Sequence, residues 1–284
     1  MKDVILDTLS DSLSLLPFLF VTYLIMEYVE HKAGDKFEKA LHKAGRVGPL
    51  FGGVIGVVPQ CGFSAAASNL YAGRIITLGT LFAVYLSTSD EMLPIFVSER
   101  LDVSMIVKIL AVKAVIGIII GFIVDFILRM TGKADLEGDL ESLGERKHSC
   151  CEGEGILKPA IVHTLQVFFF IMIISFAINL IVDFVGLDRL HSGVLGEPVI
   201  GALICALIGL IPNCGASVAI TQFYLEGVIS LGSMMAGLLT GAGVGLLVLF
   251  KVNNHLKENL KIAGLLYAFG VIGGILIELS GFAV

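Results

Sequence analysis

The chain has 284 residues, of which 56% are hydrophobic and only 15% are charged, with a mean hydropathy of +0.92 and a net charge of -6. Soluble domains carry about 25% charged residues, so this composition excludes an ordinary soluble domain. The apolar residues gather in long runs, which indicates a multi-pass integral membrane protein. We therefore expect membrane lipid and a small ion or small molecule as partners, with no nucleic acid and no cofactor, and we leave a homodimer open.

Eight apolar segments follow one another along the chain: 12–30, 47–59, 75–97, 103–129, 158–185, 198–212, 228–250 and 261–283. The first lacks a basic start and a small-residue cleavage site, so we interpret it as a retained helix and not as a signal peptide. Because about 20 apolar residues span a bilayer, segments 47–59 and 198–212 are too short to cross it. Each of these two ends at a proline and continues into a small, polar stretch. Such interrupted segments at matching places in two halves are typical of a transporter binding site.

The two halves of the chain repeat one another at a single offset of 153 residues. At this offset Pro59-Gln60-Cys61-Gly62 falls on Pro212-Asn213-Cys214-Gly215, and Asp125 falls on Glu278. One offset that holds over about 70 residues indicates a duplication. Each half has an odd number of membrane crossings, so the second half should be inverted relative to the first. Asp125 and Glu278 lie near predicted helix ends, where we expect both carboxylates to face solvent.

This pattern predicts an all-α integral membrane fold of two inverted-topology repeats, each with a broken re-entrant or short-helix hairpin. The eight long or half segments count as up to ten transmembrane helices. We divide the chain into an N-terminal membrane repeat (1–129), a polar cytoplasmic linker (130–157) and a C-terminal inverted repeat (158–284). With the N-terminus outside, fourteen basic residues fall on inside segments and three on outside segments. The positive-inside rule therefore predicts that both termini lie outside.

The two Pro-polar-Cys-Gly motifs form the first candidate site. Proline removes a backbone donor and glycine relaxes the helix, and such backbone is tolerated inside a membrane only beside protein or a water-filled cavity. Helices that begin near Gly62 and Gly215 would direct partial positive charge into that cavity. The other interpretation makes the two motif cysteines small apolar residues at a tight helix crossing. The predicted substrate-binding residues are Gln60, Cys61, Gly62, Ser64, Ser68 and Asn69 in the first half and Asn213, Cys214, Gly215, Ser217, Thr221 and Gln222 in the second.

A second candidate site interrupts the apolar segment 75–97 with Ser87-Thr88-Ser89-Asp90-Glu91. Carboxylates inside a membrane are costly and mark functional sites, although these two could also be solvated at an interface. The equivalent stretch of the second half, which begins at Thr240, carries no charge. This asymmetry is expected if one half holds a proton or cation site. Lys113 is expected either to pair with Asp90 or Glu91 as a proton-coupling switch or to snorkel to the membrane edge.

The linker 130–157 is polar and acidic, and it holds a third candidate cluster of His148, Cys150 and Cys151. Thiolates select soft ions such as copper(I), zinc or trivalent arsenic over manganese. We consider this segment either a capture site for a soft metal or an ordinary flexible linker.

Several motifs of the chain resemble one family of membrane proteins. These are the stretch PQCGFSAAASNLY that begins at Pro59, the stretch GRIITLG that begins at Gly73, the stretch STSDE that begins at Ser87 and the later PNCG that begins at Pro212. They resemble the ten-helix heavy-metal exporter family, whose members are labelled arsenic efflux protein or manganese transporter and which is distantly akin to ArsP-type permeases. The resemblance covers most of the chain outside 130–157. It implies a permease of a bacterial or archaeal inner membrane.

The residues leave the substrate open. Cysteine thiols favour trivalent arsenic or another thiophilic ion, which is our first hypothesis for an exporter. Asp90, Glu91 and the amide and hydroxyl oxygens favour manganese or another hard cation. Opposed helix N-termini equally suit a small organic anion. The chain has no nucleotide-binding motif, so we expect proton or ion coupling.

Two other classes of membrane protein compete with a transporter. A membrane-embedded lipid phosphatase needs acids clustered with Arg or His, and the hairpins offer only Arg74. A structural or sensory subunit fits the acidic linker but does not explain the broken helices. We therefore predict a secondary-active transporter and not an enzyme.

Overall fold

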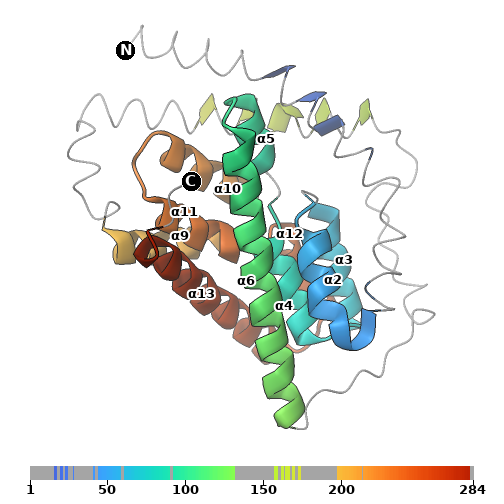
Figure 1. The fold of residues 1–284 in the computed structure, drawn as a ribbon. Coiled ribbons are helices and arrows are strands. Elements are labelled where there is room, and N and C mark those ends of the chain that lie inside the picture. The colour runs from blue at the N-terminus through green and yellow to red at the C-terminus, as the bar shows by residue number, and fades with distance from the viewer. Residues whose placement is uncertain are drawn as a thin grey trace, which may run out of the picture.

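The computed structural model describes residues 44–58, 61–89, 92–131, 197–212 and 214–281, together with scattered helical positions between 16 and 41 and between 157 and 173. Within this part every regular element is a helix (Figure 1). Three of the described helical stretches are long and apolar enough to cross a membrane: Val103–Met130, Leu231–Val252 and Leu256–Leu279. The prediction of an all-α membrane protein is confirmed.

The described helices form two matching series. The first half holds a short 3-10 turn (Gly45–Val47) and helices α2 (Gly48–Gly56), α3 (Cys61–Ala72), α4 (Leu78–Ser87), α5 (Met92–Ser98) and α6 (Val103–Met130). The second half holds α9 (Pro198–Gly209), α10 (Cys214–Leu225), α11 (Leu231–Thr240), α12 (Val244–Val252) and α13 (Leu256–Leu279). At the offset of 153 residues, the first residues of α3, α4 and α6 fall on the first residues of α10, α11 and α13.

Equivalent hydroxyl side chains cap equivalent helices. The Thr77 side chain accepts a hydrogen bond from the Thr80 amide at the start of α4, and the Ser230 side chain accepts one from the Ser233 amide at the start of α11. A side-chain oxygen at this position satisfies one of the free amides of a first helical turn. The same local chemistry therefore begins both helices.

Two of the long apolar segments are broken in the middle. Segment 75–97 divides into α4 and α5, and segment 228–250 divides into α11 and α12. The Thr88 hydroxyl donates to the Val84 carbonyl at 2.8 Å, and hydroxyls that bond back in this way compete with a regular helix. In the second half Gly243 has a φ of 52°, a conformation that favours glycine. Each of these apolar segments therefore forms two short helices.

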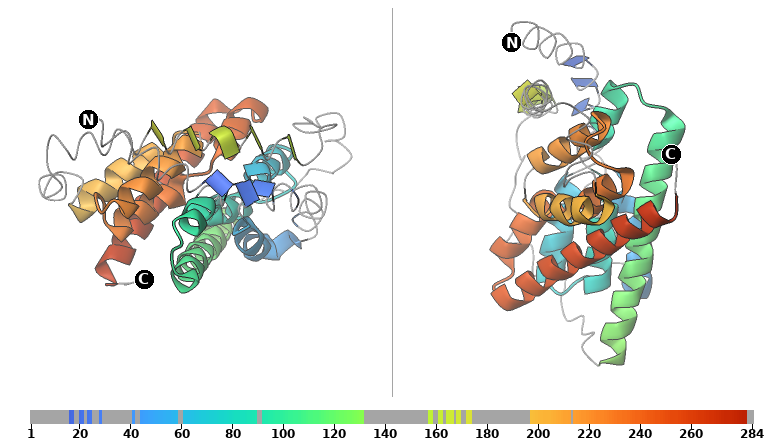
Figure 2. Two further views of the ribbon diagram at one scale, coloured as in Figure 1. Left: turned by 90° about the horizontal axis from the view of Figure 1, so that it is seen from above. Right: turned by 90° about the vertical axis from the view of Figure 1, so that its left-hand side faces the viewer.

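Packing links the two halves reciprocally. Helices α2, α4 and α6 pack against one another, and so do α9, α11 and α13. Helix α12 of the second half packs against α3 of the first, and the equivalent helix α5 packs against α10 (Figure 2). Each half therefore sends the second part of its broken helix onto the other half.

Glycines bring equivalent helix pairs into close contact. A Cβ atom added to Gly79 of α4 would lie 2.1 Å from the Gly121 carbonyl oxygen of α6. A Cβ atom added to Gly232 of α11 would lie 2.6 Å from the Gly274 carbonyl oxygen of α13. Because membrane helices associate largely through close packing of small residues, these contacts stabilise each half.

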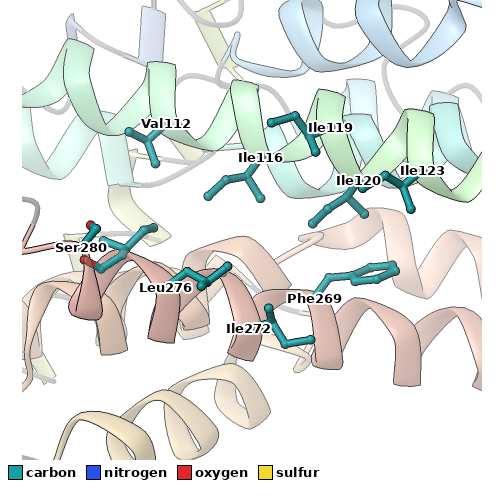
Figure 3. Close-up of a pocket in the computed structure, with 11 residues that line it drawn as sticks. Val112, Ile116, Ile119, Ile120, Ile123, Phe269, Ile272, Leu276 and Ser280 are labelled. Atoms are coloured by element: carbon teal, nitrogen blue, oxygen red, sulfur yellow. Dashed lines mark hydrogen bonds between the residues drawn. The ribbon is translucent and has the colours of Figure 1, made fainter.

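Helices α6 and α13 run antiparallel beside an apolar groove of about 550 Å³. From Val112 to Ile123 the chain of α6 runs opposite to the chain of α13 from Phe269 to Ser280 (Figure 3). Ile116 and Ile119 line the groove on one side, and their equivalents at the offset of 153 line it on the other. These two equivalent helices therefore run in opposite directions.

Candidate functional site

Within each half, the two interruptions of the helices lie side by side. A Cβ atom added to Gly56, the last residue of α2, would lie 2.1 Å from the Ser87 hydroxyl oxygen at the end of α4. A Cβ atom added to Gly209, the last residue of α9, would lie 2.3 Å from the Thr240 hydroxyl oxygen at the end of α11. The interruption before α3 therefore lies at the level of the α4–α5 break, and the interruption before α10 lies at the level of the α11–α12 break.

The first turns of α3 and α10 both reach the α11–α12 break. A Cβ atom added to Gly245 would lie 2.7 Å from Ser64 Cβ. A Cβ atom added to Gly241 would lie 3.7 Å from the Ser217 hydroxyl oxygen. Two of the predicted substrate-binding residues, one from each half, are thus brought to the same interruption.

Ser68 is engaged in helix packing. Its hydroxyl lies 2.7 Å from the Ser64 carbonyl oxygen, 2.7 Å from the Gly245 carbonyl oxygen and 2.7 Å from the Tyr85 hydroxyl. Ser64 and Ser68 are both buried, whereas Asn69 and Gly62 are half-buried. The contact with α12 therefore occupies this face of α3. A role for Ser64 and Ser68 in substrate binding stays a prediction.

Lys113 lies between the broken helices of the two halves. Its side chain is 0% exposed, so the prediction that it snorkels to the membrane edge is wrong. The ammonium Nζ donates to the Thr88 carbonyl at 2.5 Å and to the Leu238 carbonyl at 2.9 Å. These carbonyls belong to the carboxyl-terminal ends of α4 and α11, where the helix dipole places partial negative charge. One buried cation therefore binds both helix ends.

The hydroxyls of the α4–α5 break are all buried. The Ser87 hydroxyl donates to the Ala83 carbonyl at 2.7 Å, and the Ser89 hydroxyl lies 3.3 Å from the Ser87 carbonyl. The equivalent of Ser87, Thr240, donates to the Ala206 carbonyl of α9 at 3.0 Å. These contacts hold the ends of α4 and α11 in place.

Thr221 and Gln222 differ from the residues above because two of their oxygen atoms have no partner among the residues that the structure describes. The side chains are 0% and 5% exposed, and within this part of the chain neither Thr221 Oγ1 nor Gln222 Oε1 makes a hydrogen bond. Both residues were predicted from the repeat of the hairpin motif. Their unsatisfied oxygens depend on the residues that surround them, so no sequence pattern indicates them.

Several predicted residues lie outside the part of the chain that the structure describes. These are Gln60, Asn213, Asp90, Glu91, His148, Cys150 and Cys151, together with the side chains of Cys61 and Cys214. Cys61 and Cys214 are the first residues of α3 and α10, one position before the predicted starts. Among the described residues no group of three or more His, Cys, Asp or Glu side chains could hold a metal ion.

The paired carboxylates Asp125 and Glu278 hold equivalent helix starts. The Gly79 amide donates to Asp125 at 2.9 Å, and the Gly232 amide donates to Glu278 at 2.7 Å. Thr77 also donates to Asp125 at 2.7 Å, and Asp125 is only 4% exposed. The prediction that Asp125 faces solvent was therefore wrong. Its carboxylate stabilises the amino-terminal end of α4, where the helix dipole favours negative charge.

A cluster that the sequence did not indicate joins the halves at one end of the molecule. Arg74 donates to both carboxylate oxygens of Glu258 at 3.0 Å, and the Tyr71 hydroxyl also donates to Glu258. The Arg74 guanidinium lies 5.4 Å from the centre of the Tyr71 ring, and the hydrogen bond to Glu258 raises the pKa of Arg74. At the offset of 153 residues the charged pair corresponds to Gly227 and Met105, so the opposite end lacks an equivalent ion pair at these positions.

A comparison with known protein families identifies the family of the chain. A family described as "Putative, 10TM heavy-metal exporter" matches residues 1–196, which include the first Pro-polar-Cys-Gly motif and Lys113. No curated protein and no solved structure matches the chain. Because the match covers more than half of the chain, this multi-pass membrane protein belongs to the 10TM heavy-metal exporter family.

Proposed function

We propose that the chain is a secondary-active exporter of a thiophilic metal or metalloid, with trivalent arsenic as its substrate. The substrate binds between the two halves, at the level of the helix breaks. Family membership supports export of a heavy metal. The cysteines that begin α3 and α10 supply soft sulfur ligands of the kind that select trivalent arsenic.

The observation that carries this proposal is the position of Lys113. Secondary transporters bind substrate and coupling ions where discontinuous helices meet near the bilayer midplane. The Lys113 ammonium joins the broken helix α4 of one half to the broken helix α11 of the other. A change of charge beside this ammonium would alter how strongly the two halves hold together.

Proton coupling follows from the sequence next to this contact. Thr88, whose carbonyl accepts from Lys113, stands two residues before Asp90 and three before Glu91. In the proposed cycle one of these carboxylates takes up a proton after the substrate leaves. Neutralisation of the carboxylate changes the charge near the Lys113 ammonium of the first half, and this alters its contact with the Leu238 carbonyl of the second half and allows the halves to return.

The antiparallel pairing of α6 with α13 supports two inverted repeats. In the proposed organisation the repeats 1–129 and 158–284 are joined by a cytoplasmic linker, 130–157, and both termini lie outside. Relative movement of inverted halves around a fixed site gives alternating access. His148, Cys150 and Cys151 would then capture the soft ion on the cytoplasmic side.

The test is transport by the purified full-length chain in proteoliposomes. We expect arsenite transport that a pH gradient drives and that Asp90→Asn or Glu91→Gln abolishes. Arsenite transport that both substitutions leave unchanged and that a pH gradient does not affect would contradict proton coupling.

A hard divalent cation is the second candidate substrate, because Thr221 and Gln222 offer unsatisfied oxygen atoms. Manganese chloride and a small carboxylate therefore form two further arms of the transport assay. Transport of manganese without arsenite would replace the thiophilic proposal. Transport of the carboxylate alone would favour the organic-anion hypothesis.

A further inference from the structure

Thr221 and Gln222 stand out because buried polar atoms almost always have hydrogen-bond partners in folded proteins. Thr221 Oγ1 and Gln222 Oε1 are enclosed in the protein without a hydrogen-bond partner in the described part of the chain. An unsatisfied buried acceptor lowers the stability of the folded state. A bound ligand is one reason for a structure to keep such a pair.

The equivalent position of the first half shows one partner that Thr221 lacks. Ser68, the equivalent of Thr221, lies 2.7 Å from the Tyr85 hydroxyl. At the offset of 153 residues Tyr85 corresponds to Leu238, which has no hydroxyl. The second half therefore has an apolar side chain where the first half has an internal hydrogen-bond partner.

The neighbours of Thr221 place it beside the candidate site. Ser217 and Thr221 are one helical turn apart, so they lie on the same face of α10. Ser217 faces Gly241 at the α11–α12 break, and Ile220 Cδ1 lies 2.6 Å from a Cβ position on Gly237. This part of α10 thus packs against the last turns of α11, and one of their carbonyls, that of Leu238, accepts from Lys113.

We propose that Thr221 and Gln222 form an asymmetric oxygen subsite that the transported species completes. An amide oxygen such as Gln222 Oε1 accepts hydrogen bonds and does not donate them. The subsite therefore takes a species that carries positive charge or presents O–H groups, such as a divalent cation or neutral arsenous acid. The negative charge of an oxyanion such as arsenate is unfavourable beside the Gln222 acceptor. This inference rests on the proposed function and assigns substrate selection to the second half.

The experiment measures thermal unfolding and ligand binding of the purified full-length chain. The variants are Thr221→Val and Gln222→Leu, which remove the unsatisfied oxygens, and the probes are arsenite, manganese chloride and arsenate. We expect both variants to unfold at a higher temperature than wild type without ligand. We also expect each to bind arsenite or manganese at least 10-fold more weakly, whereas wild type does not bind arsenate.

Thr80→Val is the matched control, because Thr80 is also a buried threonine but its hydroxyl lies 2.7 Å from the Thr77 hydroxyl. We expect this control to unfold at a lower temperature than wild type and to bind the probes as wild type does. Binding of arsenite without manganese would identify neutral arsenous acid as the ligand of the subsite, and binding of manganese without arsenite would identify a divalent cation.

Three results would overturn the subsite. Variants that bind arsenite and manganese like wild type would reject the subsite alone and leave the transporter proposal intact. Variants that unfold at a lower temperature without ligand would show that the oxygens already have internal partners. A wild-type chain that neither binds nor transports any probe would reject both the subsite and the proposed substrate class.

Discussion

The two halves of the chain hold their helices with the same contacts but place different side chains at their centre. A carboxylate on α6 accepts from the Gly79 amide, and a carboxylate on α13 accepts from the equivalent Gly232 amide. By contrast, Lys113 corresponds to the buried Leu266, and Tyr85 corresponds to Leu238. The comparison shows that the two halves share these scaffold contacts, whereas charge and hydrogen bonding at the centre belong to one half or the other.

Substitution of Lys113 should give the largest effect. Lys113→Met leaves the Thr88 and Leu238 carbonyls without this donor, at a cost of about 1–3 kcal/mol for each buried group. We expect loss of transport and a large fall in unfolding temperature. Leu266→Met places the same side chain at the equivalent position and should cost less than about 1.5 kcal/mol. Equal effects of the two substitutions in thermal unfolding and transport assays would show that Lys113 has no special role.

The paired carboxylates test the shared scaffold. Asp125→Ala removes the acceptor of the Gly79 amide and the Thr77 hydroxyl, so we expect a loss of about 1–3 kcal/mol in the free energy of unfolding. Glu278→Ala removes the acceptor of the Gly232 amide from a less buried site and should cost less. Denaturant unfolding of both variants in detergent would measure this order. A larger loss for Glu278→Ala would contradict the role given to Asp125.

The ion pair at one end of the molecule should give the smallest effect. Arg74 has a φ of 59°, and its equivalent Gly227 has a φ of 71°, so an arginine occupies a backbone conformation that favours glycine. Arg74→Ala keeps this strain and removes an exposed ion pair worth about 0.2–1 kcal/mol. Arg74→Gly also removes the pair but relieves the strain.

We therefore expect Arg74→Gly to match wild type in thermal unfolding and Arg74→Ala to fall below it. High salt should reduce the difference between wild type and Arg74→Ala, because salt screens exposed charges. If Arg74→Gly were the less stable of the two variants, the strain argument would be wrong.

The sequence predicted the features that depend on local composition. Long apolar runs predicted a membrane protein, and Pro59 and Pro212 marked where regular helix ends. The break between α4 and α5 was missed because an apolar segment with a few hydroxyls has the composition of one helix. The hydrogen bond from the Thr88 hydroxyl to the Val84 carbonyl is not visible in the sequence. The burial of Asp125 was missed because it depends on the approach of α4 to α6. The free oxygens of Thr221 and Gln222 depend in the same way on neighbours distant in sequence.

X-ray absorption spectroscopy of the arsenite-loaded, full-length chain tests the central claim most directly. The sample carries Cys150→Ser and Cys151→Ser, so that the remaining cysteines are the motif residues Cys61 and Cys214 and the buried Cys205 of α9. We expect arsenic with both sulfur and oxygen neighbours, and a loss of the sulfur neighbours when Cys61→Ser and Cys214→Ser are added. Bound arsenic with the same neighbours before and after loss of Cys61 and Cys214 would contradict a substrate held between the two halves by the motif thiols.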